Sequence, residues 1–337
     1  MKKILSIGFH LIFCLGLCGA MARAGCDAPD FIFEKDGEAE FVRKIKPQGI
    51  KAAQGIVTVK YDGVEKIALS SGYWANNSLV LDFGTGFVES KNNLSSTLPS
   101  QLLASVHEAY NGLWWTSYRE EKIYNTDLRL KRKKEIAVPG LIGAVGLSSI
   151  ASGTKIIVPT RLKPHQLIVL DAVELELLER FNLIGFDQAP YDIDTNENCI
   201  FFVESSFGRI WSLDQSEIQT AATKFLEQPE FIRWIKAKLG LKANLKPNVW
   251  FDQAKRIQHL NIKNNVVYVI DTDDYSIITI DLKNHRVRKY ILPIKHIFRG
   301  LAVGDNGSVL LTGFEDKVDI RGDRTAVFEF RLNHETN

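Results

Sequence analysis

A pattern that returns about every 44 residues constrains the fold of this chain more than any other feature. Short apolar runs that end in an acidic residue recur along the sequence. Their last residues are Asp82, Asp127, Asp171, Asp214 and Asp281, and a sixth run ends in Arg331. Successive ends lie 45, 44, 43, 67 and 50 positions apart. Such a period indicates a repeat architecture in which each repeat is one small supersecondary unit.

A second marker keeps the same period and lies ahead of the first. Turn pairs such as Asn111-Gly112 and Asn306-Gly307 each precede an apolar, strand-like run. Asn-Gly favours the positive φ angles of tight hairpins. Each repeat therefore predicts strand, tight turn, strand, loop, strand and often a fourth strand. Four short strands in about 40–45 residues are typical of one blade of a β-propeller.

The two ends of the chain predict that six blades close into a ring. After Arg331 only residues 332–337 remain, which are too few for a fourth strand in the last blade. At the other end, strand-like sequence within residues 30–45 precedes the first full repeat. We expect this segment to complete the last blade and so protect its edge. The alternative is an open solenoid, which the missing strand at one end and the surplus strand at the other disfavour.

Two segments resemble a known group of propellers. The run Arg-Gly-Leu-Ala-Val-Gly-Asp-Asn-Gly-Ser-Val-Leu at 299–310 resembles the strand–turn–strand core of NHL-type blades. The segment 267–281 is similar to that group and to the related YVTN and TolB-like six-bladed propellers. The resemblance covers about residues 50–335 and implies an all-β propeller fold. It implies no particular function, because the fold hosts both binding proteins and enzymes.

The first 24 residues have the pattern of a cleaved signal peptide. Lys2 and Lys3 precede an apolar run at 4–19, and Ala22-Arg23-Ala24 fits a small-x-small cleavage site. The run is short for a transmembrane anchor, which needs about 20 residues. We therefore expect a periplasmic or secreted protein whose mature part, 25–337, is a single propeller domain without a transmembrane segment.

The charge balance of the mature chain argues against a nucleic-acid partner. Residues 1–24 contain three basic residues and no acidic residue, so 39 basic and 40 acidic residues remain. Nucleic acids and anionic membranes both require a clustered positive field. We expect instead a small-molecule, glycan or protein partner.

Two cysteines remain after the signal segment, Cys26 and Cys199. In an oxidising compartment the two can form a disulfide. Alternatively, Cys26 carries a lipid anchor, although Arg23 stands where a lipidation motif has an aliphatic residue. A third alternative leaves both thiols unpaired, with Cys199 as a small core residue.

The long step of 67 residues predicts an insertion in the fourth blade. The extra sequence follows Asp214, and apolar residues at helical spacing predict two short helices within about 215–245. Their apolar faces are expected to pack on the side of the propeller. The alternative is that Trp234 and the nearby lysines form a docking surface.

The repeat also predicts where a ligand binds. Loops that join the second strand to the third, and one blade to the next, share one face of a propeller, here called the loop face. Polar and aromatic side chains that converge there are typical of a binding site. The predicted ligand-binding residues are Arg161, Asp187, Tyr191, Glu204, His259, Asp271, His296 and Arg299. The alternative is that these residues are polar only because water fills the mouth of any propeller.

The motifs leave the activity open. The sequence contains no Gly-x-Ser-x-Gly, His-Glu-x-x-His or Cys-x-x-Cys. No cofactor and no metal site are predicted, and catalytic residues cannot be named. The first hypothesis is an exported binding or scaffold module that recognises a peptide, glycan or protein on the loop face. The alternative resembles the gluconolactonase and paraoxonase propellers, which are metal-dependent hydrolases, with Glu204 and Asp271 as contributors to a central cation site.

Overall fold

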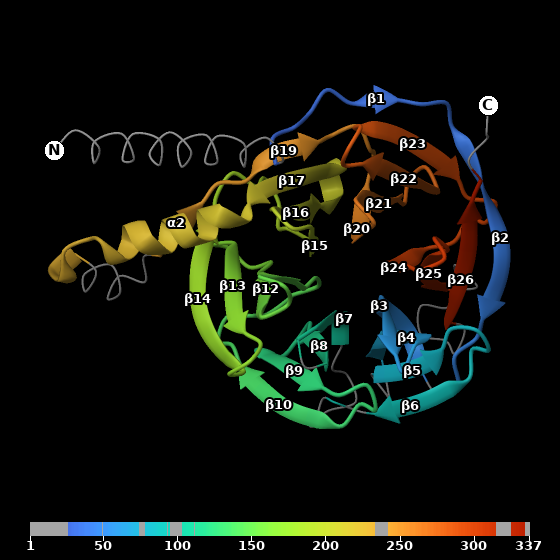
Figure 1. The fold of residues 1–337 in the computed structure, drawn as a ribbon, viewed down its shortest axis with the longest axis horizontal. Coiled ribbons are helices and arrows are strands. Elements are labelled where there is room, and N and C mark those ends of the chain that lie inside the picture. The colour runs from blue at the N-terminus through green and yellow to red at the C-terminus, as the bar shows by residue number, and fades with distance from the viewer. Residues whose placement is uncertain are drawn as a thin grey trace, which may run out of the picture.

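The computed structural model describes residues 26–48, 50–73, 78–92, 94, 103–110, 112–232, 242–314 and 325–333. Antiparallel strands dominate it and form sheets arranged around a central axis (Figure 1). The first strand of each repeat lies nearest this axis, and the last lies at the outer rim. The chain is thus a β-propeller, as the repeat predicted.

The first three sheets follow the chain in order. One contains β3 (Lys51–Tyr61), β4 (Val64–Tyr73), β5 (Ser78–Asp82) and β6 (Val88–Asn92). The next contains β7 (Leu103–Ala109), β8 (Gly112–Ser117), β9 (Lys122–Thr126) and β10 (Arg132–Ala137). The third contains β11 (Ser148–Ile150), β12 (Lys155–Pro159), β13 (Gln166–Asp171) and β14 (Glu176–Leu183), with β18 (Asn244–Leu245) at its outer edge.

The remaining strands form two further sheets. One contains β15 (Asp192–Thr195), β16 (Cys199–Glu204), β17 (Arg209–Asp214) and β19 (Asn248–Phe251), and the helical turn η1 (Ser205–Phe207) joins β16 to β17. A nine-stranded sheet has the order β20 (Ile257–Lys263), β21 (Val266–Asp271), β22 (Ser276–Asp281), β23 (Arg286–Ile291), β2 (Gly37–Ile45), β26 (Thr325–Leu332), β25 (Val309–Phe314) and β24 (Phe298–Val303). β1 (Ile32–Phe33) also pairs with β23.

Burial on both faces explains why the third strand of a repeat is an uninterrupted apolar run. In β5, Leu79 and Leu81 belong to one buried cluster, and Val80 between them belongs to another. Successive side chains of a strand point to opposite faces, and each face packs against a neighbouring sheet. Stacking around the ring therefore buries both faces, so the strand does not alternate with polar residues.

The N-terminal segment pairs with the last strand of the chain. β2 runs antiparallel to β26, with Ala39 opposite Leu332 and Ile45 opposite Val327. The predicted strand within 30–45 is therefore present, at the edge of β26. Arg43 in β2 also donates to Glu329 in β26 at 2.5 Å. This pairing joins residues 286 positions apart and covers an edge that would otherwise be open.

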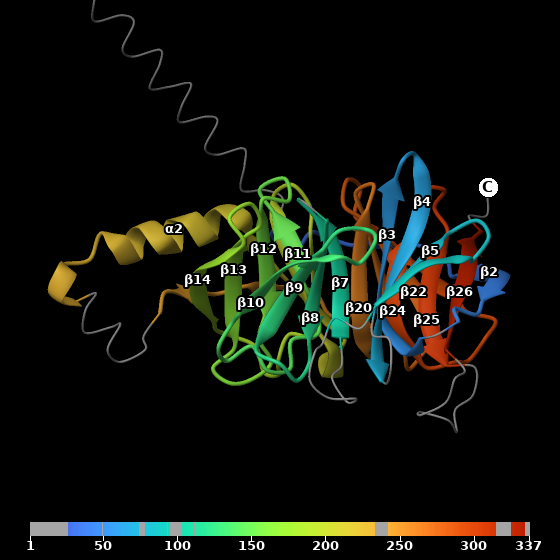
Figure 2. The same cartoon turned by 90° about the horizontal axis from the view of Figure 1, so that it is seen from below.

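The long step after Asp214 contains the helix α2 (Gln215–Leu226). Ile218 on this helix is buried in a cluster with Leu213 and Leu245. Figure 2 shows that the helix extends sideways from the body of the ring. Residues 233–241, which include part of the second predicted helix and Trp234, lie outside the described residues. The two-helix insertion therefore stays a prediction.

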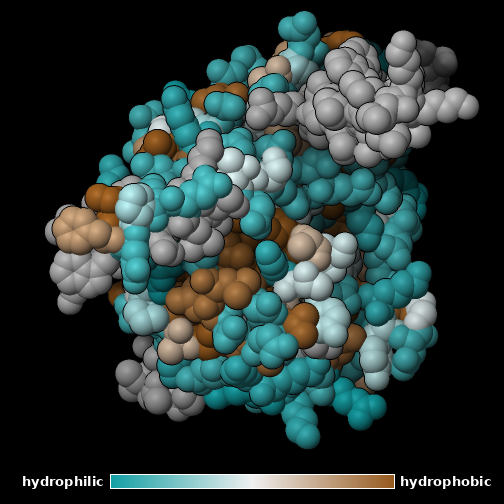
Figure 3. Space-filling view, turned by 60° about the vertical axis from the view of Figure 1, so that its left-hand side comes forward, coloured by the Kyte–Doolittle hydropathy of each residue, from teal (hydrophilic) through white to brown (hydrophobic). Residues whose placement is uncertain are grey.

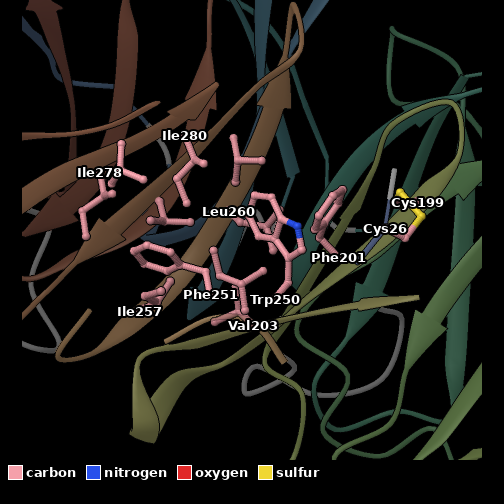
Figure 4. Packing of buried hydrophobic residues seen from close by; sticks show 14 residues of the cluster. Cys26, Cys199, Phe201, Val203, Trp250, Phe251, Ile257, Leu260, Ile278 and Ile280 are labelled. Carbon is pink, nitrogen blue, oxygen red and sulfur yellow. A yellow bond between two sulfur atoms is a disulfide. The ribbon is translucent and has the colours of Figure 1, made fainter. Parts of the chain in front are cut away.

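A disulfide joins Cys26 to Cys199 across 173 positions. It lies in a buried cluster that includes Phe201, Trp250 and Phe251 (Figure 4). Phe31, which follows soon after Cys26, meets the rings of Trp250 and Phe251 edge-on, with centroids 5.2 and 5.3 Å away. The N-terminal residues are thus fixed to the body of the protein both covalently and by aromatic packing. None of the described helices is long and apolar enough to cross a membrane.

Candidate functional site on the loop face

Four of the predicted residues come together where the innermost strands begin. Arg161 lies between β12 and β13, and Tyr191 immediately precedes β15. His259 lies near the start of β20, and Arg299 near the start of β24. The third sheet, the two ends of the nine-stranded sheet and the loop before β15 therefore supply this group, which we call the mouth cluster.

Tyr191 is the centre of the mouth cluster. The guanidinium group of Arg161 lies 5.2 Å from the centroid of its ring, and Arg299 donates a hydrogen bond to its hydroxyl. The ring of His259 meets the ring of Tyr191 edge-on at 5.5 Å. Burial raises the pKa of Tyr191, and the positive charges of Arg299 and Arg161 oppose that shift. The phenol therefore stays neutral at physiological pH and can both donate and accept a hydrogen bond.

A carboxylate orients His259. Its Nδ1 lies 3.1 Å from Oδ2 of Asp192, the first residue of β15. The same carboxylate accepts the backbone N–H of Leu260 at 3.3 Å. The Nε2 atom of His259 is buried and has no hydrogen-bond partner among the described residues. A histidine held by a carboxylate at one nitrogen presents its other nitrogen to any group that enters the site.

Below the mouth cluster the channel is narrow. Its cavity measures about 40 Å³, and His107, Asp192, Asp194 and His259 contribute to its wall. A cavity of 10–15 Å³ or more is needed for one water molecule, so this space admits only a few. A larger ligand therefore cannot bind inside this part of the channel.

Two titratable groups line this channel and have opposite pKa shifts. Burial lowers the pKa of His107 to about 4. Burial raises the pKa of Asp194 to about 6, although hydrogen bonds from Ile262, Thr195 and Ser148 act in the opposite direction. Both shifts have the same cause, because a low-dielectric interior disfavours the charged form of either group.

The predicted acids Glu204 and Asp271 are engaged in internal bonds. Glu204 is fully buried and accepts hydrogen bonds from Gln188 N at 2.6 Å and from Trp211 Nε1 at 2.9 Å. Asp271 accepts the backbone N–H groups of Lys255 at 2.9 Å and Arg256 at 3.2 Å. Each carboxylate thus holds a loop that leads to or from its own sheet. A ligand role for either residue stays a prediction, and we leave both out of the mouth cluster.

The last two predicted residues, Asp187 and His296, contact groups other than Tyr191. Asp187 is exposed and pairs with Arg209 at 2.8 Å. His296 lies between β23 and β24, where its ring packs on Phe328 with centroids 5.1 Å apart. Both lie on loops that lead to an innermost strand, Asp187 before β15 and His296 before β24.

Sequence reasoning missed two members of the site. Tyr118 follows β8, and the guanidinium group of Arg161 lies 5.9 Å from its ring centroid. Asp192 orients His259, as described above. The signal for Asp192 was present in Asp192-Ile193-Asp194, because alternate residues of an innermost strand point toward the same side.

The acids and histidines of the described segments do not gather in a way that suits a metal ion. Within those segments no group of three or more His, Cys, Asp or Glu side chains is close enough to hold one. The mouth cluster instead combines two guanidinium groups, one phenol and an imidazole, and Tyr118 adds a second phenol beside Arg161. That donor set suits an anionic or hydrogen-bonding ligand.

Comparison with known proteins places the chain in a fold class. No family model and no curated protein matches the sequence. Among solved structures it is similar to virginiamycin B lyase from Staphylococcus aureus, with a TM-score of 0.58 and 10% identity over 87% of this chain and 100% of that one. It is also similar to a streptogramin B lyase, with a TM-score of 0.54 and 14% identity over 88% of this chain and 97% of that one.

A third neighbour is not named as a lyase. The WD40 repeats of RRP9 match with a TM-score of 0.58 and 11% identity, over 89% of this chain and 99% of that one. At such low identities these likenesses show the β-propeller fold and nothing about activity. The class of protein is therefore established by the fold, and the function must be argued from the site.

Proposed function

We propose that this protein is an exported six-bladed β-propeller that binds a peptide, glycan or protein partner on its loop face. The observation that carries the proposal is the mouth cluster. Arg161, Tyr191, His259 and Arg299 are far apart in sequence, yet their side chains contact one another at one end of the channel. Convergence of polar and aromatic groups from several elements is typical of a binding site.

The strand pairing supports a count of six blades. The nine-stranded sheet contains two four-stranded orders, β20 to β23 and β24 to β26 with β2. Only two residue pairs join them, Gly37 with Tyr290 and Glu38 with Ile291. We therefore count them as two blades, the second completed by the N-terminal strand.

The disulfide supports export. Disulfides persist in oxidising compartments and are rare in the cytosol. The sulfur of Cys26 that bonds to Cys199 is not available for a lipid thioether, so we do not propose a lipid anchor. We propose that residues 1–24 are removed and that the mature protein is periplasmic or secreted.

The chemistry of the mouth cluster indicates which kind of partner would bind there. Two guanidinium groups approach Tyr191 from different sheets, and guanidinium groups bind carboxylates through short, charge-assisted hydrogen bonds. The channel below is too narrow for the ligand to enter. We therefore propose a partner that presents an acidic group to the mouth, such as an acidic peptide or an acidic glycan.

Arrays of acidic and neutral peptides and glycans test the proposal, with the mature protein as the probe. The variant Arg161→Gln/Arg299→Gln should bind acidic ligands about tenfold more weakly, because it removes both charges. Arg129→Gln is the matched control, since this exposed arginine lies in the turn between β9 and β10 on the opposite face. Thermal melting of each variant shows whether the fold is intact.

Retained binding by the double variant would contradict the assignment of the site. Loss of binding in Arg129→Gln as well would show that only the net charge matters. Absence of any array ligand that prefers acidic over neutral members would contradict the proposed chemistry.

The pair Asp192 and His259 favours acid–base catalysis as a second candidate function. A histidine whose Nδ1 contacts a carboxylate at 3.1 Å can exchange a proton through its Nε2 atom. Two of the structural neighbours are named lyases, so the fold admits enzymes. Mass spectrometry of a bound array ligand distinguishes the candidates. A product that forms with the wild-type protein and not with His259→Gln supports an enzyme, and an unchanged ligand supports a binding module.

A further inference from the structure

A second polar cavity lies at the end of the ring opposite the loop face. It measures about 530 Å³ and lies between the β20–β23 part of the nine-stranded sheet and the part formed by β24–β26. The turn at Asn306-Gly307 and the end of β26 form one wall, and the N-terminal segment at Glu34 closes the outer side. We call this cavity the seam groove. Its volume falls within the range of small-molecule sites.

A row of three polar side chains forms one wall of the seam groove. Tyr268, Thr279 and Arg288 lie in register across β21, β22 and β23 and line the cavity. Thr279 lies two residues before Asp281, the last residue of its run.

The same register in two other sheets is apolar. In the first sheet it pairs Ala68 with Val80, and in the third it pairs Ile157 with Val169. These four side chains are buried against the next sheet around the ring. In the other three units the residue at this register is polar, and Asn125, Ser212 and Glu329 are buried and bonded to groups inside the protein. The row beside Thr279 differs from both kinds because its side chains line a cavity.

Three arginines give the seam groove a positive character. Arg286 and Arg288 both contact Glu34, at 3.3 and 2.6 Å. The side chain of Arg331, at the other wall, is 64% exposed and contacts Glu40 at 3.6 Å. The other acid of the lining, Asp281, accepts the backbone N–H groups of its own turn.

The carboxylate of Glu34 shows what kind of group this lining accepts. It enters from the N-terminal segment and lies between two guanidinium groups. Each guanidinium group has five donors, so Arg286 and Arg331 retain N–H groups beyond these contacts. A second anion can therefore bind at the exposed side of the cavity, where Arg331 and Arg286 carry most of their surface.

Hydroxyl and amide groups supply the rest of the lining. Burial raises the pKa of both Tyr268 and Tyr290, so both phenols are neutral hydrogen-bonding groups at physiological pH. Thr279, Asn284 and Asn306 add further donors and acceptors. A ligand that matches this lining carries several hydroxyl groups together with one negative charge.

We propose that the seam groove binds a sugar that carries one anionic group, either a sugar acid or a sugar phosphate. Its charge lies against Arg286 and Arg331, and its hydroxyl groups face Tyr268 and Thr279. This site is separate from the mouth cluster, and it does not depend on the function proposed for the loop face.

Calorimetric titration of the mature protein tests the proposal with three probes: glucuronate, glucose 6-phosphate and neutral glucose. At least one anionic probe should bind at one site per chain, about tenfold more tightly than glucose. A preference between the two anionic probes identifies the natural class of ligand. Arg286→Gln/Arg331→Gln should weaken that binding about tenfold, whereas Arg129→Gln should leave it unchanged.

Tyr268→Phe keeps the ring and removes one hydroxyl group. It therefore tests the proposed sugar site even if the arginine double variant does not fold. It should weaken the same probe several-fold, by the value of one hydrogen bond. The proposal is wrong if no probe binds, if glucose binds as tightly as the anionic sugars, or if neither variant changes the affinity. Binding that is lost instead in Arg161→Gln/Arg299→Gln would assign the probe to the mouth cluster and also overturn the proposal.

Discussion

Two opposed pKa shifts in the channel predict how stability depends on pH. His107 and Asp194 lie on different innermost strands, and the serine hydroxyls of β11 connect them. Ser149 Oγ lies 3.0 Å from Nε2 of His107, and Ser148 Oγ donates to Asp194 at 2.8 Å. Asp194 is buried and His107 is half-buried, and both prefer to be neutral in the folded protein.

The sign of each group's contribution to the free energy of unfolding follows from whether the folded or the unfolded state binds the proton more tightly. Between pH 4 and 6.5 the unfolded state carries a proton on His107 that the folded state lacks, so the free energy of unfolding rises with pH. Between pH 3.8 and 6 the folded state carries a proton on Asp194 that the unfolded state has lost, so the free energy of unfolding falls with pH. Each contribution amounts to about 3 kcal/mol across its window. In the wild-type protein the two nearly cancel between about pH 4 and 6.

Single substitutions should expose the two contributions. His107→Gln removes the contribution that rises with pH. The free energy of unfolding of this variant, relative to wild type, should therefore fall as the pH increases from 4 to 6. Asp194→Asn removes the contribution that falls with pH. The free energy of unfolding of this variant, relative to wild type, should therefore rise over the same pH range. The double variant should recover the wild-type slope, because both contributions are then absent.

Urea unfolding at a series of pH values measures these slopes. The comparison uses the difference between each variant and wild type, in which other titrating groups cancel. If both single variants keep the wild-type slope, neither group is buried in the neutral form and the reasoning fails.

Two further predictions concern internal bonds. Cys26→Ser/Cys199→Ser should lower the free energy of unfolding by up to about 5 kcal/mol, because the disulfide closes a loop across 173 positions; urea unfolding measures this, and reduced wild-type protein should behave like the variant. Glu204→Gln should cost about 1–3 kcal/mol, because an amide N–H₂ then faces a donor at Gln188 N or Trp211 Nε1. Array binding by Glu204→Gln should match wild type, and a loss of binding in a folded variant would return Glu204 to the candidate ligand residues.

The sequence predicted the propeller fold because the repeat encodes both strand spacing and burial. The run Ser78–Asp82 is apolar throughout, which indicated a strand covered on both faces, and β5 is such a strand. The pairing of β2 with β26 was predictable because the last repeat lacked a strand. The pairing of Cys26 with Cys199 was not, since two cysteines are equally compatible with a disulfide, a lipid anchor or free thiols.

The site was predictable only in part because position on a loop does not determine what a side chain bonds. Arg161 follows the second strand of its repeat, and Glu204 is the last residue of the second strand of the next repeat. In the structure Arg161 reaches toward Tyr191, whereas Glu204 turns inward to Gln188 and Trp211. Nearby backbone N–H groups that need an acceptor decide this difference, and a single sequence does not show them.

Equivalent positions of the repeat are a better guide to function than polarity alone. Polar residues at the mouth of the channel have two explanations, ligand binding and contact with water. At the register of Thr279 the equivalent residue is either apolar, as at Val80, or polar and bonded inside the protein, as at Glu329. Tyr268 and Thr279 line a cavity instead, so they are stronger evidence for a site than Asp187, which is exposed and bound in an ion pair.

The surface of the molecule also shows why the polarity of a residue alone is a poor guide to function. Figure 3 shows a mainly hydrophilic side of the molecule with hydrophobic atoms gathered near the centre of the view. Scattered polar or apolar residues on such a surface carry little information, since apolar atoms form much of the surface of any folded protein. In a repeat protein each position has equivalents in the other repeats, and these act as internal controls. Polar residues that line a cavity, where their equivalents are apolar or bonded inside the protein, are therefore the first to test.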